Sequence, residues 1–148
     1  MTTIAAAAID AVALEAAPIR PEWIRAGAPQ ARCTVLSQAA DGAALTAVWD
    51  CTAGEFDWHF AGDEWVHILE GEVVVDDGSG PRSLRPGDVA LFPAGSVSRW
   101  RVPTYVKKLA FCRDPMPRPV QKLVQVVRKV KGALRGGAAP AGALQASA

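Results

Sequence analysis

The chain has 148 residues, half of them hydrophobic, which is enough for one domain with its own core and excludes a chain that is disordered throughout. The formal net charge of +1 argues against broad nucleic-acid binding, and no apolar run approaches the length that spans a membrane. Three widely spaced cysteines, an odd number, favour reduced thiols in the cytoplasm over a disulfide framework.

The N-terminal part of the sequence is predicted to contain a leader and an extended segment. Residues 1–17 are rich in alanine but lack the basic start of an export signal, and Asp10 and Glu15 interrupt the apolar run. We expect these residues to form a flexible or partly helical leader. Residues 18–30 are punctuated by proline, so we expect an extended segment that Trp23 and Ile24 anchor on the domain.

Short strands separated by tight turns are predicted for the central part of the chain. The strands are expected at residues 32–37, 45–51, 55–60, 64–69, 72–76, 88–92, 98–102 and 105–112. Glycine, proline and aspartate, which turns favour, lie at residues 41–42, 61–63, 77–80, 86–87 and 93–95. No helices alternate with these strands, so the pattern predicts an all-β sandwich or barrel.

Residues 55–60 alternate between two kinds of side chain. One face of the predicted strand carries Phe56, Trp58 and Phe60, and the other carries Glu55, Asp57 and His59. Burying the aromatic side chains is favourable by about 1.5–3 kcal/mol each, whereas burying an unpaired aspartate costs energy. We therefore predict that the aromatic face points inward.

The following strand also has two distinct faces. Glu64 shares its face with large apolar side chains, and a carboxylate in such surroundings is a functional candidate. The opposite face, with Trp65, His67 and Leu69, is too apolar to leave in water, so we predict that it forms a homodimer interface. The segment 18–30 would then be able to add a strand at the edge of the partner's sheet.

Three motifs together resemble those of a cupin. They are Glu64 to Gly71, then Pro86-Gly87-Asp88, then Phe92 to Gly95 followed by Trp100. Over residues 18–117 the chain resembles the short single-domain cupins grouped with (S)-ureidoglycine aminohydrolase. The resemblance implies an RmlC-like jelly-roll barrel (a double-stranded β-helix), often dimeric, with a pocket at its wider end. It says less about activity, because one fold hosts many functions.

Cupins that bind a metal usually supply two histidines and a glutamate from the first motif and a histidine from the second. Counting back from Glu64, the two histidine positions fall on Asp57 and His59 or, one residue later, on Trp58 and Phe60. The two registers turn opposite faces inward, because a one-residue slip moves every side chain to the other face. The inward aromatic face favours the second register and leaves His59 exposed.

The second motif places Ser98 at its histidine position, and a neutral hydroxyl is a poor ligand for a transition metal. We therefore favour an incomplete site and no metal cofactor. If the other register holds, Asp57, His59 and Glu64 would form a mixed carboxylate–imidazole site for manganese, zinc or iron.

If no metal binds, the resemblance and the favoured register imply a ligand pocket. Its predicted residues are Glu64, Trp58, Phe60, Ser98 and Trp100. The glutamate would be its one strong polar group, unpaired and able to hold an amine, amide or hydroxyl of a ligand. The two tryptophans would either wall the pocket or simply fill the core.

Two further candidates have structural interpretations. His67 lies on the face opposite Glu64, which suggests a structural or interface role. Cys51 has no histidine at a recognisable partner spacing, so an inert buried thiol is expected.

The C-terminal segment differs from the rest. Apolar residues recur at helical spacing from Val120 to Leu134 and basic residues occupy much of the remainder, so residues 118–135 are predicted to form an amphipathic helix. Residues 136–148 are expected to be a disordered tail. A basic amphipathic helix can lie on an anionic membrane, but this one lacks an aromatic anchor. We expect it to pack on a protein surface instead.

Three functions are compatible with these observations. The leading hypothesis is a cytoplasmic cupin with a small-molecule pocket and no complete metal site. The second is a metal-dependent enzyme resembling (S)-ureidoglycine aminohydrolase, acting on a small nitrogen-containing acid. The third is a structural or partner-binding module whose pocket is filled by its own side chains. Metal content separates the second from the first, and pocket volume separates the third from both.

Overall fold

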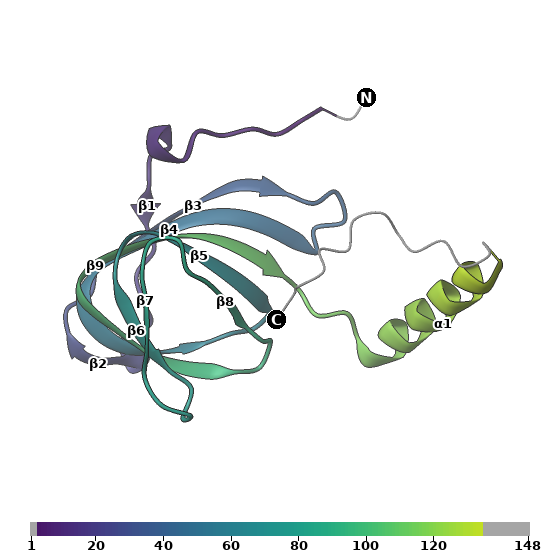
Figure 1. Cartoon of the computed structure of the whole chain (residues 1–148). Coiled ribbons are helices and arrows are strands. Elements are labelled where there is room, and N and C mark those ends of the chain that lie inside the picture. The colour runs from purple at the N-terminus through teal and green to yellow at the C-terminus, as the bar shows by residue number, and fades with distance from the viewer. Residues whose placement is uncertain (1–2, 135–148) are drawn as a thin grey trace. The chain divides into compact units, whose positions relative to one another are not determined.

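The computed structural model describes residues 3–134, in which antiparallel strands dominate (Figure 1). In chain order the elements are the 3-10 helix η1 (Ile9–Ala11), β1 (Glu15–Ala16), the 3-10 helix η2 (Pro21–Trp23), β2 (Ile24–Gly27), β3 (Ala31–Gln38), β4 (Ala44–His59), β5 (Asp63–Gly71), β6 (Val73–Asp76), β7 (Arg82–Leu84), β8 (Val89–Phe92), β9 (Val97–Arg113) and α1 (Arg118–Leu134). They divide into two compact units, one that ends at Pro115 and one that begins at Met116. The predicted all-β architecture with a C-terminal helix is confirmed.

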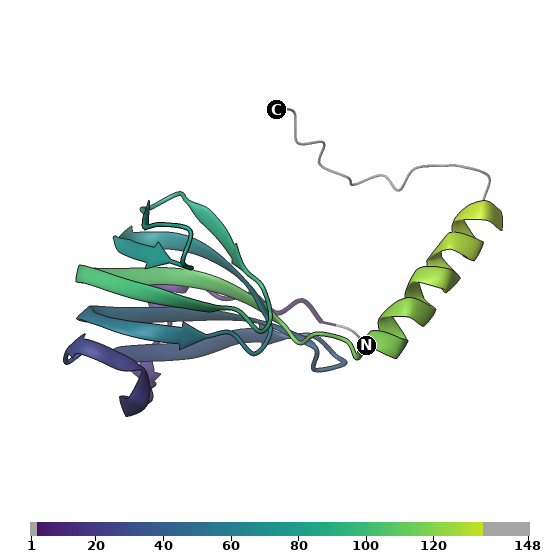
Figure 2. The same ribbon diagram turned by 90° about the horizontal axis from the view of Figure 1, so that it is seen from below.

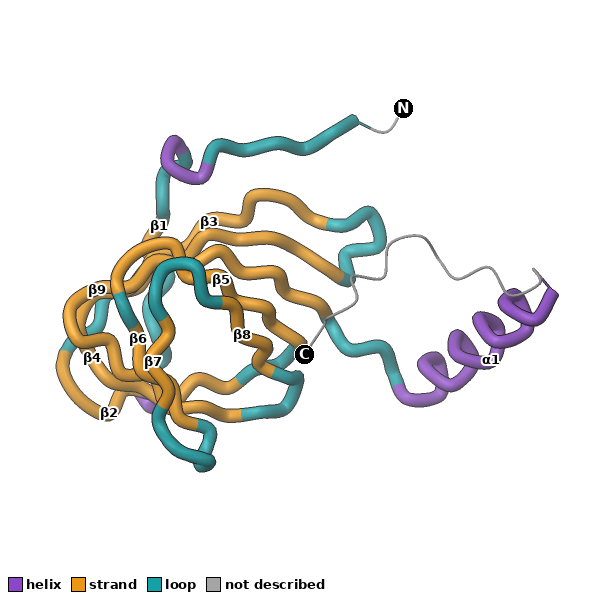
Figure 3. The backbone as a smooth tube through the Cα atoms, viewed as in Figure 1, coloured by secondary structure: helices purple, strands orange, loops and turns teal. Residues whose placement is uncertain are grey.

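Two long strands organise the first unit. The strand β4 pairs with β9 along almost its whole length, and both continue from one part of the sheet into the other (Figure 2). At one end they lie in the order β1-β3-β4-β9-β5-β8. At the other end β2 pairs with β4, and β6 pairs with both β7 and β9. The sheet therefore curls around a common core (Figure 3).

A bulge in the pairing of β4 with β9 accompanies a change in which side chains of β4 face the core. Trp49 and Cys51 are buried in the core, and so is Phe56, although strict alternation would place Phe56 on the opposite face. Between the paired residues Thr52 and Gly54, β4 has one residue, whereas β9 has two between their partners Tyr105 and Val102, and the alternation along β4 is reversed across this shift. The two strands predicted at residues 45–51 and 55–60 are therefore one strand that contains a register shift.

Glycine is required at the bulge. A Cβ atom on Gly54 would lie 2.7 Å from the Cβ and Cδ atoms of Pro29, closer than real side chains approach. The segment before β3 can therefore cross β4 tightly only where a side chain is missing. The same segment contains Trp23, which packs against the core as predicted.

The aromatic face of β4 points inward as predicted. Phe56 and Phe60 are buried, Trp58 is half-buried against the core, and His59 on the other face is exposed. Trp100 of β9 lies opposite Phe56 in the pairing and is 1% exposed. At about 1.5–3 kcal/mol for each large apolar side chain, this aromatic cluster is a major part of the folding energy.

The predicted leader contacts the barrel over part of its length. In β1, Glu15 pairs with Cys33 of β3, and the hydroxyl of Thr34 donates a hydrogen bond to the carbonyl of Ala13. Asp10 lies 3.5 Å from the ammonium group of Lys107. These contacts hold residues 10–16 along the edge of β3 and beside Lys107 of β9.

The helix α1 belongs to the second compact unit. It begins at Arg118, one residue before Pro119, and its charged residues are all basic. It falls within the predicted range 118–135, while residue 135 and the predicted tail at 136–148 lie outside the described residues. No helix within residues 3–134 combines the length and the hydropathy that crossing a bilayer requires.

Candidate functional site

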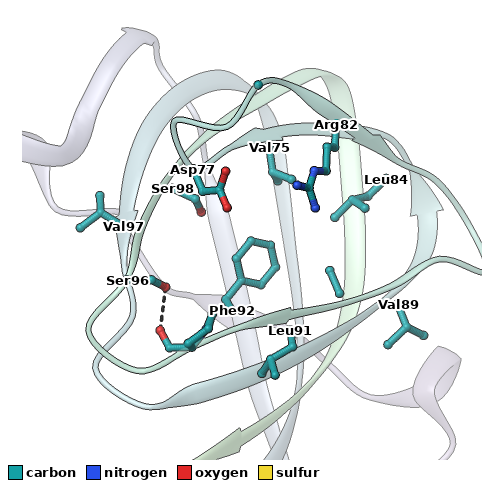
Figure 4. Close-up of a pocket in the computed structure, with 13 residues that line it drawn as sticks. Val75, Asp77, Arg82, Leu84, Val89, Leu91, Phe92, Ser96, Val97 and Ser98 are labelled. Carbon is teal, nitrogen blue, oxygen red and sulfur yellow. Dashed lines mark hydrogen bonds between the residues drawn. The ribbon is translucent and has the colours of Figure 1, made fainter.

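A cavity of about 370 Å³ opens between the hairpin of β6 and β7 on one side and β8 on the other (Figure 4). In the described part of the chain β7 pairs only with β6 and β8 pairs only with β5, so the two strands leave a gap in the sheet. The start of β9 closes one wall with Val97 and Ser98. The gap in strand pairing therefore forms a mouth to the barrel.

The cavity combines an apolar floor with charges of both signs. The ring of Phe92 lies in its middle, with Asp77 and Ser98 on one side and Arg82 and Leu84 on another (Figure 4). Hydrogen bonds from the Ser79 hydroxyl and backbone N–H lower the pKa of Asp77, so this carboxylate is ionised at neutral pH. Arg82 supplies the positive charge.

The barrel interior behind Phe92 is filled by aromatic rings. Phe92 stacks on Phe60 with ring centroids 4.6 Å apart and lies 5.3 Å from the ring of Trp100. Of the five residues predicted to line the pocket, Ser98 lines the cavity, whereas Trp58, Phe60, Glu64 and Trp100 lie in the interior. Phe92, Asp77 and Arg82 were not predicted as site residues, because the gap between β7 and β8 is a feature of the tertiary structure.

Glu64 is not the lone carboxylate that the sequence suggested. Its Oε1 atom accepts a hydrogen bond from the ammonium group of Lys108 at 2.6 Å, so the expectation that it is unpaired is wrong. Lys108 is 3% exposed, and its β9 neighbours Val106 and Ala110 are buried as well. The alternation along β9 was the available signal, since Lys108 has the same parity as these two apolar residues.

Three indole rings surround the ammonium group of Lys108. The Nζ atom lies 4.6 Å from the ring centroid of Trp100, 4.8 Å from that of Trp49 and 5.8 Å from that of Trp58. These distances are typical of cation–π interactions, which strengthen where water is excluded. The interior therefore holds a carboxylate, an ammonium group and a ring of tryptophans.

The three alternative metal ligands do not come together. Asp57 lies on the outer face, where the guanidinium groups of Arg99 and Arg25 bind it and lower its pKa to about 2. His59 is exposed and stacks on Trp23, with ring centroids 4.9 Å apart. Only Glu64 points inward. Within residues 3–134 no group of three or more histidine, cysteine, aspartate or glutamate side chains is placed to hold a metal ion.

The other motif positions do not fit a metal either. Trp58 and Phe60 carry no ligand atom suited to a transition metal. The hydroxyl oxygen of Ser98 accepts a hydrogen bond from the indole N–H of Trp100 at 2.9 Å, and both residues are buried. The remaining candidate ligand among the motif positions is the Glu64 carboxylate, which already forms an ion pair with Lys108. A single carboxylate does not make the three- or four-ligand set that a transition metal requires.

His67 and Cys51 lie where the sequence predicted them. His67 is on the outer face beside Trp65, and four apolar side chains of this face are exposed, namely Trp65, Val89, Leu91 and Phe111. Cys51 is completely buried, and burial raises the pKa of its thiol to about 12. The thiol is therefore protonated and inaccessible, as expected for an inert cysteine.

Comparisons with known proteins agree with the jelly-roll architecture. Residues 38–110 match the model of the EutQ-like cupin domain. The structure is similar to that of a Salmonella typhimurium protein described as ethanolamine utilization protein Q, with 27% sequence identity and a TM-score of 0.52 over 57% of this chain and 69% of that one. No curated protein matches the chain.

Two further structures, with lower sequence identity, are similar in fold. The EutQ protein of Clostridium difficile shares 17% identity at a TM-score of 0.53, over 58% of this chain and 69% of that one. A DUF861-family protein from Pseudomonas syringae shares 24% identity at a TM-score of 0.63, over 69% of this chain and 45% of that one. These three proteins are not named for ureidoglycine, so the narrower group expected from the sequence stays a prediction.

Proposed function

Residues 38–110 form a cupin domain of the EutQ-like type, and from this premise we propose that the protein binds a small organic molecule in the cavity between β7 and β8. The observation that carries the proposal is the cavity itself. Its volume of about 370 Å³ falls within the range of ligand sites, and a few polar groups converge on an apolar floor.

The lining of the cavity favours a small ligand that carries a carboxylate and a nitrogen donor. The guanidinium group of Arg82 would bind a carboxylate, the ionised Asp77 would accept a hydrogen bond from an amine or amide, and Phe92 would contact the carbon atoms between them. A molecule with one group of each kind, such as a small nitrogen-containing acid, matches this arrangement.

A ligand panel tests the proposal. Ethanolamine, β-alanine, N-carbamoylglycine and 1-propanol are titrated by calorimetry and thermal shift; ethanolamine is included because the Salmonella protein is named for its utilization. We expect the two acids to bind best, and we expect Arg82→Gln to weaken them at least tenfold, since a charge-assisted hydrogen bond is worth about 1.5–3 kcal/mol. Arg85→Gln is the matched control, because Arg85 lies outside the cavity and pairs with Glu72. Equal affinity in both variants, or no binding by any compound, would contradict the proposal.

A metal-dependent enzyme that resembles (S)-ureidoglycine aminohydrolase is the second candidate. The cupin-like motif from Glu64 to Gly71 supports it, while Trp58, Phe60 and Ser98 at the other motif positions weigh against it. We propose that the purified protein carries far less than one metal ion per chain. Near-stoichiometric manganese, zinc or iron in elemental analysis, lost in both Glu64→Gln and His59→Ala, would favour the enzyme instead.

We also propose that the protein is a cytoplasmic homodimer. The exposed apolar side chains of Trp65, Leu91 and Phe111 support an interface on the outer face of β5, β8 and β9. The free thiols of Cys33, Cys51 and Cys112 support a reducing compartment.

A further inference from the structure

The polar groups of the barrel interior are arranged around a single cation. Lys108 reaches in from β9, Glu64 accepts a hydrogen bond from its ammonium group, and the rings of Trp49, Trp58 and Trp100 face it at 4.6–5.8 Å. The side chain of Lys108 is 4% exposed and that of Glu64 is 14% exposed. A buried ammonium group is costly unless a counter-ion and polarisable neighbours replace its water, and here both are present.

The partners of this cation are those that select an organic ammonium ion rather than a metal. Indole faces attract cations through their quadrupole and offer no lone pair for coordination. One carboxylate and three indoles would therefore bind an alkylammonium group well and a transition metal poorly. The glutamate comes from the position that supplies a metal ligand in metal-binding cupins.

We infer that the metal position of the cupin barrel is a cage for an alkylammonium ion in this protein, and that Lys108 is the ion that fills it. The chain supplies its own cation, covalently fixed to β9. None of Glu64, Trp49, Trp58 and Trp100 lines the cavity between β7 and β8, so the inference does not depend on what that cavity binds.

The cage can be emptied and refilled in an experiment. Lys108→Ala removes the three carbon atoms and the ammonium group that 1-propylammonium contains. We expect the melting temperature of this variant to fall by about 10–15 °C, because it leaves a buried carboxylate without its partner. Added 1-propylammonium should raise it by about 5 °C at ten times its dissociation constant, while 1-propanol, which has a similar size and no charge, should not.

Lys107→Ala is the matched control. Lys107 is the adjacent residue on β9, but it points outward and pairs with Glu70, which is more than half exposed. Its melting temperature should hardly change, and 1-propylammonium should affect it no more than it affects the parent protein. An equal response of all three proteins to 1-propylammonium, or an equal response of Lys108→Ala to 1-propanol, would overturn the inference.

A second pair of variants covers the case in which Lys108→Ala does not fold. Lys108→Met keeps most of the side-chain volume and removes the charge, and Glu64→Gln in the same chain removes the charge that is left over. We expect the double variant to melt at a higher temperature than Lys108→Met alone, because two neutral groups replace a broken ion pair. A double variant that melts at the same temperature or lower would show that the two charges are not coupled.

Discussion

The hydrogen bond between Ser98 and Trp100 gives a sharp test of how the barrel interior is built. Both residues are buried, with 3% and 1% of their surfaces exposed, and the indole N–H donates to the serine hydroxyl at 2.9 Å. Ser98→Ala removes the acceptor and leaves the N–H buried without a partner. Such a group costs about 1–3 kcal/mol, so the free energy of unfolding should fall by that amount.

Urea denaturation followed by tryptophan fluorescence measures this loss. The midpoint should fall while the slope with denaturant stays constant, because the substitution changes stability and not the surface exposed on unfolding. Ser96→Ala is the control, since the hydroxyl of Ser96 donates to the Pro93 carbonyl at an accessible turn where water can replace it. That variant should lose less than about 0.5 kcal/mol.

A double-mutant cycle separates the hydrogen bond from packing. In a Trp100→Phe background there is no indole N–H to satisfy, so Ser98→Ala should cost less than about 0.5 kcal/mol there. The reasoning is refuted if Ser98→Ala costs as little as Ser96→Ala in the parent protein. It is also refuted if the cost is the same with and without the indole N–H.

The arginine partners of Asp57 lower its pKa to about 2, so its contribution to the free energy of unfolding is complete above its ordinary pKa near 4 and is lost as the pH falls toward 2. Asp57→Asn should cost about 1 kcal/mol at pH 7 in urea denaturation and should lose less stability than the parent protein between pH 4 and pH 2. Equal losses in the two proteins over that pH range would argue against this role. Gly54→Ala should destabilise the fold by about 1–3 kcal/mol through its clash with Pro29, and adding Pro29→Ala to this variant should recover part of that loss in calorimetry. No recovery in the double variant would show that the contact with Pro29 is not the cause. The Cys51 thiol, buried and with its pKa raised to about 12, should react with Ellman's reagent at pH 8 only after urea is added; rapid labelling of the native protein at Cys51 would be contrary. Light scattering of the parent protein should give a dimer mass and Trp65→Lys a monomer mass, whereas a monomeric parent across micromolar concentrations would count against the proposed interface.

Local alternation was sufficient to predict most of the strands and the direction of the aromatic face. Burial of Phe56 and Phe60 depends on side-chain chemistry within a single strand, and this information is present in a short stretch of sequence. The bulge at Gly54 was missed because it is defined by the register against β9, which lies far away in the chain. The three-residue strand β7 was too short to produce an alternating pattern.

The candidate site was harder to predict than the fold. Ser98 lines the cavity at the barrel mouth, whereas Glu64, which was assigned no partner, pairs with Lys108. Lysine in a strand usually points to solvent, so the shared parity of Lys108 with the buried Val106 and Ala110 was the one sequence signal of its burial. Its role becomes visible only when β5 and β9 are side by side and three tryptophans from β4 and β9 surround the charge.

The pairing of β4 with β9 also determines when the chain can fold. Paired residues lie between 38 positions (His59 with Val97) and 69 positions (Ala44 with Arg113) apart, so these contacts form only after a long loop has closed. During synthesis, the edge of β4 that pairs with β9 stays unpaired until β9 has left the ribosome. The apolar face of β4 remains exposed during that time, and such an exposed strand is prone to aggregation. A domain dominated by distant pairings folds in milliseconds to seconds rather than microseconds. Because β4 and β9 pair along almost their whole length, the barrel can fold only after β9 has been synthesised.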